Sequence, residues 1–138
     1  TTSLYNGELM EPIDSDPNAD MIAWYYYNSD GTTHAVKGKS PNAWGFYDMS
    51  GNVWEWTWDW YGPYSAEVTN PVGPREGPGR VFRGGSWGDV PSSVRLAYRD
   101  NNAPAYRFRN IGFRLARTLE NRISLIFLFI SISFNFSI

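Results

Sequence analysis

The stretch NAWGFYDMSGNVWEWTWDW, residues 42–60, decides the fold of this chain. Its first half predicts turns, because Gly45 and Gly51 interrupt a run of mixed polar and aromatic residues. Its second half alternates with a period of two, which is typical of a β-strand. The strand is expected to carry four indoles on one face, in the core or in an interface: Trp54, Trp56, Trp58 and Trp60.

Outward from this strand, the pattern predicts few and short elements. Residues 1–20 show no sustained apolar period, so they are expected to form a looped lead-in without a helix. Met21–Tyr27 is predicted to be a short buried strand, and 61–79 a long loop broken by Gly-Pro pairs. Arg80–Arg83 and Ile111–Arg117 are expected to be strands that pair in the core and hold both ends of a mostly looped segment, 88–110.

Length and composition indicate one loop-rich domain. The chain has 138 residues, 17% of them aromatic, with 13 Gly and 9 Pro, so no long amphipathic helix is expected. The formal net charge is only -2, which gives no global basic field for nucleic acid. At this level electrostatics selects no partner.

Two residue counts exclude several kinds of catalytic site. The chain contains no cysteine, so it lacks the thiolates that hold Cu(I), structural zinc or iron–sulfur clusters. Its one histidine, His34, cannot form the multi-histidine centre of a non-haem iron site. We therefore expect neither copper nor iron as a cofactor.

The motif over residues 42–56 resembles the signature of the formylglycine-generating enzyme and sulfatase-modifying factor family. Three further pieces follow in the family's order: 59–61, 80–87, and 95–99 together with 111–114. The resemblance implies an irregular α+β fold of the C-type-lectin-like type, loop-rich with short strands. It also implies that the N-terminal part of the family domain is missing, that 1–117 is the domain's C-terminal part, and that 118–138 is an apolar tail outside it.

A calcium site is the cofactor prediction. Asn52 and Glu55 offer hard oxygen ligands, which suit Ca²⁺ better than a transition metal, and the resemblance places a structural calcium here. The expected ligands are Glu55, Asn52, Gly51 and Val53, the last two through their backbone oxygens. The alternative is that Glu55 is the buried partner of an arginine, either Arg83 or Arg114.

Four functions compete. The resemblance implies an oxidase that converts a sulfatase cysteine to formylglycine, but the copper-binding cysteine pair of that family is absent from the interval between 87 and 112. A related iron-dependent branch needs several histidines. A truncated or degenerate copy is a third reading. The fourth is a non-catalytic module that binds a small molecule or a protein, as in C-type lectins and the variable proteins of diversity-generating retroelements.

The binding module is the function we expect, because Tyr and Asn on a supported loop give adaptable contacts at low entropy cost. The candidate ligand-binding residues lie in 88–110: Gly88, Asp89, Tyr98, Asp100, Asn101, Asn102, Tyr106, Phe108 and Asn110.

The tail over 123–138 is uncharged and rich in Ile, Phe and Ser. Its sixteen residues are fewer than the ~20 of a membrane-spanning helix. A sticky extension is expected, with a membrane contact or a packed strand as alternatives. No secretory signal opens the chain, but its start suggests a truncated N-terminus, so the compartment stays open.

Overall fold

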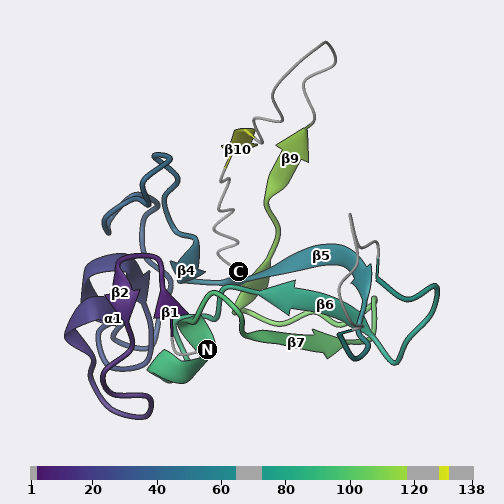
Figure 1. Cartoon of the computed structure of the whole chain (residues 1–138), viewed down its shortest axis with the longest axis horizontal. Helices are drawn as coiled ribbons and strands as arrows, with labels where there is room; N and C mark the ends of the chain where they lie inside the picture. The colour runs from purple at the N-terminus through teal and green to yellow at the C-terminus, as the bar shows by residue number, and fades with distance from the viewer. Residues whose placement is uncertain (1–2, 65–72, 118–127, 131–138) are drawn as a thin grey trace.

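The computed structural model describes residues 3–64, 73–117 and 128–130 (Figure 1). Its elements are short. The helical ones are α1 (Pro17–Ile22) and a 3₁₀ turn, η1 (Pro91–Val94). The strands are β1 (Ser3–Leu4), β2 (Gly7–Glu8), β3 (Ala23–Trp24), β4 (Ser50–Gly51), β5 (Trp54–Trp60), β6 (Arg80–Arg83), β7 (Arg99–Asn102), β8 (Ile111–Gly112), β9 (Leu115–Arg117) and β10 (Leu128–Ile130).

A four-stranded sheet in the order β7-β6-β5-β8 forms the centre of the fold. β6 pairs antiparallel with β5 and with β7, while β8 pairs parallel with β5. The predicted strands at 80–83 and 111–117 therefore do not pair with each other, because β5 lies between them. The predicted closing strand is also divided into β8 and β9.

The predicted tryptophan strand is present as β5, but its four indoles do not form the single packed face that the alternation predicts. The β5–β6 register shifts between Trp56 and Trp60, and such an irregularity turns the intervening side chains relative to the sheet. Trp54 is 5% exposed and lies in the core, whereas Trp58 is 85% exposed. The four indoles thus divide between core and surface.

The N-terminal region contains a helix that the sequence analysis did not expect. Asp16 caps α1, because its Oδ1 accepts a hydrogen bond from the Ala19 backbone N–H at 2.8 Å, and Pro17 stands in the first turn. The predicted strand over 21–27 is correspondingly reduced to Ala23–Trp24, which pairs parallel with β4.

Two groups of buried apolar side chains hold these parts together. One group surrounds α1 and reaches Val94 in η1: Leu4, Leu9, Ala19, Ile22, Ala23, Tyr25 and Val94. The sheet contributes Trp54, Val81 and Phe82, and Trp87 follows in the next turn. Residues 88–110, expected to be mostly loop, instead supply η1 to the first group and β7 to the sheet.

The C-terminal region is described only in part. β10 pairs antiparallel with β9, and both extend away from the four-stranded sheet (Figure 1). The rest of the predicted tail lies outside the described residues, as does 65–72 of the predicted long loop. No helix in the described ranges has the length and apolar character to cross a bilayer.

Candidate functional site

The predicted calcium ligand Glu55 is held by Arg114. The Arg114 Nε donates to both carboxylate oxygens, at 3.0 and 2.8 Å, and Nη2 donates to Oε1 at 2.6 Å. Arg114 also donates to the carbonyls of Tyr47 and Asp48. Of the two arginines considered as alternative partners, Arg114 is the one found, while Arg83 donates to the Leu96 carbonyl.

The electrostatics of Glu55 fit this role. Burial raises the pKa of its carboxyl, and the hydrogen bonds and charge of Arg114 offset only part of that effect. The Arg114 guanidinium is thus the group that favours the ionised form of this buried carboxyl.

Among the other predicted calcium ligands, the Asn52 side chain is also occupied by a protein partner. Asn52 has φ 64° and is buried, and its side chain bonds the His34 backbone twice, accepting from N–H at 2.9 Å and donating to C=O at 3.1 Å. Gly51 has φ 74°, and a Cβ there would lie 2.3 Å from the Trp24 carbonyl oxygen. Val53 lies against Gly112.

In the arrangement observed, two of the four predicted calcium ligands, the Glu55 carboxylate and the Asn52 side chain, already have protein partners. Across the described ranges, no group of three or more His, Asp or Glu side chains gathers to hold a metal. The chain's dependence on calcium stays a prediction.

The predicted ligand-binding residues fall into three places. The first is an internal polar cluster around Ser86, which is fully buried. Asp89 Oδ2 accepts hydrogen bonds from the Ser86 N–H and hydroxyl, and Asn110 Nδ2 donates to the same hydroxyl at 3.0 Å. Gly88 donates its N–H to this oxygen as well. These hydrogen bonds of Asp89, Asn110 and Gly88 are thus made to Ser86, within the chain.

The second place is one face of the sheet. The register sets Asp100 opposite Phe82 and Asn102 opposite Arg80, so these side chains share a face, whereas Asn101 points to the other side with Val81. We define the aromatic face as the four rings Trp54, Trp56, Phe82 and Tyr98. The Phe82 ring centroid lies 4.9 Å from that of Trp54 and 5.3 Å from that of Trp56. The Trp54 centroid lies 5.9 Å from that of Tyr98.

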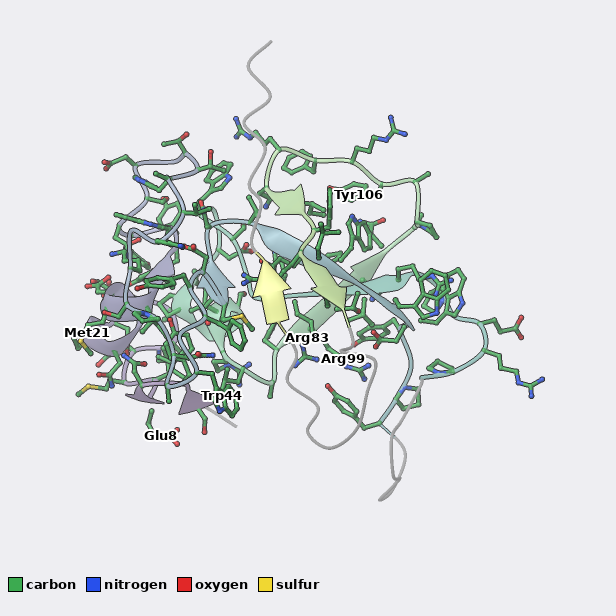
Figure 2. The ribbon with its side chains drawn as sticks, turned by 90° about the horizontal axis from the view of Figure 1, so that it is seen from above. Glu8, Met21, Trp44, Arg83, Arg99 and Tyr106 are labelled. Carbon is green, nitrogen blue, oxygen red and sulfur yellow. The ribbon has the colours of Figure 1, made fainter. Side chains whose placement is uncertain are left out.

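The third place is the loop over 103–110, which joins the two edge strands β7 and β8 and so has to cross the sheet. Tyr106 and Phe108 stack at 6.1 Å with an interplanar angle of 14°, and they are 38% and 53% exposed. Hydrogen bonds from Tyr106 N–H to the Ala103 carbonyl and from Ile111 N–H to the Phe108 carbonyl fix the turns around them. Figure 2 shows Tyr106 on this loop beside the sheet.

The sequence analysis missed an arginine at the end of the aromatic face. The Arg80 guanidinium lies 4.0 Å from the Trp60 ring and 4.8 Å from the exposed Trp58 ring, and it donates to the Trp58 carbonyl. Its partner in the register is Asn102, so the stack adjoins the predicted site. The signal in the sequence that could have indicated this stack was the row of alternating tryptophans, because guanidinium groups commonly lie over indole rings.

A second such stack lies at the start of β7. The Arg99 guanidinium lies 3.8 Å from the Tyr64 ring and 4.7 Å from the Tyr61 ring, and it donates to the Gly62 carbonyl. Figure 2 shows Arg99 near Arg83, its partner in the register. Arginine held by rings is thus a repeated feature of this region.

Comparisons with known proteins bear on this arrangement. The family model for the sulfatase-modifying factor enzyme 1-like domain matches residues 8–119. The serine/threonine-protein kinase pkn1 of Chlamydia pneumoniae is 39% identical over 100 residues, covering 69% of this chain and 16% of the kinase. The formylglycine-generating enzyme of Streptomyces coelicolor is 42% identical over 95 residues, covering 64% of this chain and 30% of the enzyme.

Solved structures give the same picture. Treponema denticola variable protein 1 matches with a TM-score of 0.68 and 39% identity, over 72% of this chain and 37% of that one. PvdO from Pseudomonas aeruginosa matches with a TM-score of 0.56 and 35% identity, over 67% and 38%. The chain thus spans between 16% and 38% of the length of these four proteins.

Proposed function

The chain belongs to the sulfatase-modifying factor enzyme family, and on that premise we propose that it is a non-catalytic module that binds a ligand or another protein. Its fold is the irregular, loop-rich, C-type-lectin-like type that the sequence motifs predict. The family therefore supplies the scaffold, and the residues on it carry the proposal.

The observation that carries the proposal is the stacked pair Tyr106 and Phe108, partly exposed on a loop whose turns are hydrogen bonded and whose ends join the sheet. Aromatic rings held in this way give a large contact area and lose little conformational entropy on binding. The likeness to a protein named for its variability supports the same reading.

The alternative is the formylglycine-generating oxidase that the curated relatives suggest. Copper chemistry of that kind needs thiolates, and the sequence contains none. Incubation of the chain with copper and a sulfatase-derived cysteine peptide should leave the peptide unchanged by mass spectrometry. Appearance of formylglycine would establish the oxidase and refute the proposal.

The binding proposal can be tested before any natural ligand is known. We suggest selecting displayed random peptides on the full chain and measuring the selected peptides by fluorescence anisotropy. Tyr106→Ala and Phe108→Ala should each weaken binding at least about tenfold, because truncating a central aromatic anchor costs ~2 kcal/mol or more. Their melting temperatures should stay within a few degrees of the wild type.

Trp44→Ala is the matched control. Trp44 is 83% exposed but lies in the turn at 42–46, away from the aromatic face, so its loss should leave binding unchanged. If both loop variants bind as the wild type does, or if both unfold, Tyr106 and Phe108 are scaffold residues and the proposal is wrong.

A further inference from the structure

The small net charge of the chain hides a strong segregation of charge. Residues 80–117 contain eight arginines and two aspartates, for a formal charge of +6. Residues 1–79 contain three basic and eleven acidic residues, for a formal charge of -8. The basic segment is the one that builds β6, β7, β8 and the loop over 103–110, and so it carries the stacked pair Tyr106 and Phe108.

The arginines of this segment differ in their surroundings. Arg114 forms an ion pair with Glu55. Arg80 and Arg99 lie over rings and donate to carbonyls, and Arg109 lies 5.0 Å from the Trp87 ring. A ring contacts the flat face of a guanidinium and leaves N–H donors at its edge, while the full positive charge remains.

The exposed arginines lie on the loop that carries the aromatic pair. Arg107 and Arg109 alternate with Tyr106 and Phe108, and both arginines are exposed. Arg80, beside the exposed Trp58, is the register partner of Asn102, the residue that precedes this loop. Exposed rings and guanidinium groups therefore alternate along the loop and recur beside its start.

We propose that the partner of this surface is an acidic segment of a protein, in which carboxylates alternate with apolar or aromatic side chains. This rests on the proposed binding function and specifies its ligand. The apolar side chains would pack on the exposed rings of Tyr106, Phe108 and Trp58. Each carboxylate would meet the edge of a guanidinium in a bidentate contact.

A nucleic acid fits the same surface less well. Asp100 stands exposed on the edge strand β7, opposite Phe82 and two residues before Asn102, where a continuous phosphate backbone beside the loop would meet its charge. A long polyanion would also extend beyond the basic segment toward the acidic remainder of the chain. A short acidic segment confines its charge to the face, within the screening length of about 8–10 Å.

The test uses the peptide selection described above and asks what was selected. Peptides retained by the full chain should carry more Asp and Glu than Lys and Arg, with at least one aromatic residue. Replacing their Glu and Asp by Gln and Asn should weaken binding about tenfold or more, as should raising the salt from about 0.05 M to about 0.3 M.

Two charge variants locate the effect. Arg80→Gln and the double variant Arg107→Gln/Arg109→Gln should each weaken peptide binding about fivefold or more. Lys37→Gln removes the same charge from an exposed position in the acidic part of the chain, and it should change binding less than about twofold. Melting curves of all three variants check folding, and if Arg80→Gln melts early, the double variant at the exposed positions decides the test.

The possible outcomes distinguish a failure of the acidic-partner proposal from a failure of the proposed binding function. Selected peptides that are neutral or basic, yet depend on Tyr106 and Phe108, would overturn the acidic partner and keep the binding module. Equal losses in Lys37→Gln and the arginine variants, or tighter binding of oligothymidylate than of any peptide, would also overturn it. Self-association that the arginine variants abolish would identify the acidic part of a second copy as the occupant instead. If the wild type retains no more peptide than the Tyr106→Ala and Phe108→Ala variants do, both proposals are refuted.

Discussion

Arg114 and Arg80 belong to the same sheet region, but they have opposite surroundings. The Arg114 side chain is 5% exposed and satisfies its donors with the Glu55 carboxylate and two carbonyls. Arg80 lies over two rings, one of which is 85% exposed. A buried arginine fully paired with protein groups fixes the scaffold, whereas an arginine held by rings keeps its charge available to a partner. The two arginines thus separate the scaffold from the surface that we propose binds a partner.

The largest expected effect is the loss of stability when the scaffold arginine, Arg114, is replaced. Arg114→Met leaves the buried Glu55 carboxylate without its partner, so it should lower the free energy of unfolding by about 3–5 kcal/mol in denaturant titrations. Arg83→Met is the matched control, because Arg83 donates to a single carbonyl and should cost far less. Equal costs would show that the ion pair does not hold the scaffold.

The next effect concerns Asp16, a second polar group satisfied inside the scaffold. Its Oδ2 accepts hydrogen bonds from the backbone N–H groups of Met10 and Glu11, at 2.6 and 2.7 Å, in addition to the helix cap at Ala19. Asp16→Asn should cost about 2 kcal/mol at neutral pH, because bonds to a charged acceptor are lost. The exposed Asp14→Asn should cost little.

The pH dependence of the same variant sharpens the test. Burial acts to raise the pKa of Asp16, but the backbone N–H donors outweigh it and hold the pKa below its ordinary value of 3.8. A carboxyl with a lowered folded pKa stabilises the fold above pH 3.8 and loses that contribution as the pH falls through the folded value. The stability difference between wild type and Asp16→Asn should therefore shrink below about pH 4. A constant difference down to lower pH would contradict the lowered pKa.

A smaller effect is expected from the C-terminal tail. Deletion of residues 123–138 removes β10, which pairs only with β9 among the described strands, and it removes an uncharged apolar segment. Solubility should improve, and the free energy of unfolding should change by about 1 kcal/mol or less. Loss of cooperative unfolding would show instead that the tail completes the core.

The smallest effect is expected for calcium, measured as the part of any calcium-dependent rise in melting temperature that is lost in Glu55→Gln. Because Arg114 occupies both oxygens of this carboxylate, Glu55→Gln should lower the melting temperature by the same amount in calcium and in chelator. A calcium-dependent rise in the wild type that disappears in Glu55→Gln would establish the calcium ligand that the sequence predicts.

Local patterns predicted a useful share of the fold. The alternation in 54–60 predicted β5, the β-branched and aromatic pair within 80–83 predicted β6, and the predicted turn before Phe46 is present. The helix at 17–22 was missed, although Asp16 followed by Pro17 is a helix start signal, because six residues are too few for a visible apolar period. Sequence reasoning also named both partners open to Glu55, calcium or an arginine, and could not choose between them.

The sequence by itself determined the family, the absence of cysteine and the aromatic character of the loop over 103–110, since each depends only on which residues follow one another. The tertiary structure decided which chemically similar side chains became scaffold and which stayed on the surface. It did so through pairings between residues far apart in the chain: Arg114 with Glu55, Asn110 with Ser86, and Arg80 with Trp60. A polar group's role depends on whether such a distant partner satisfies it, and local pattern contains no record of that partner.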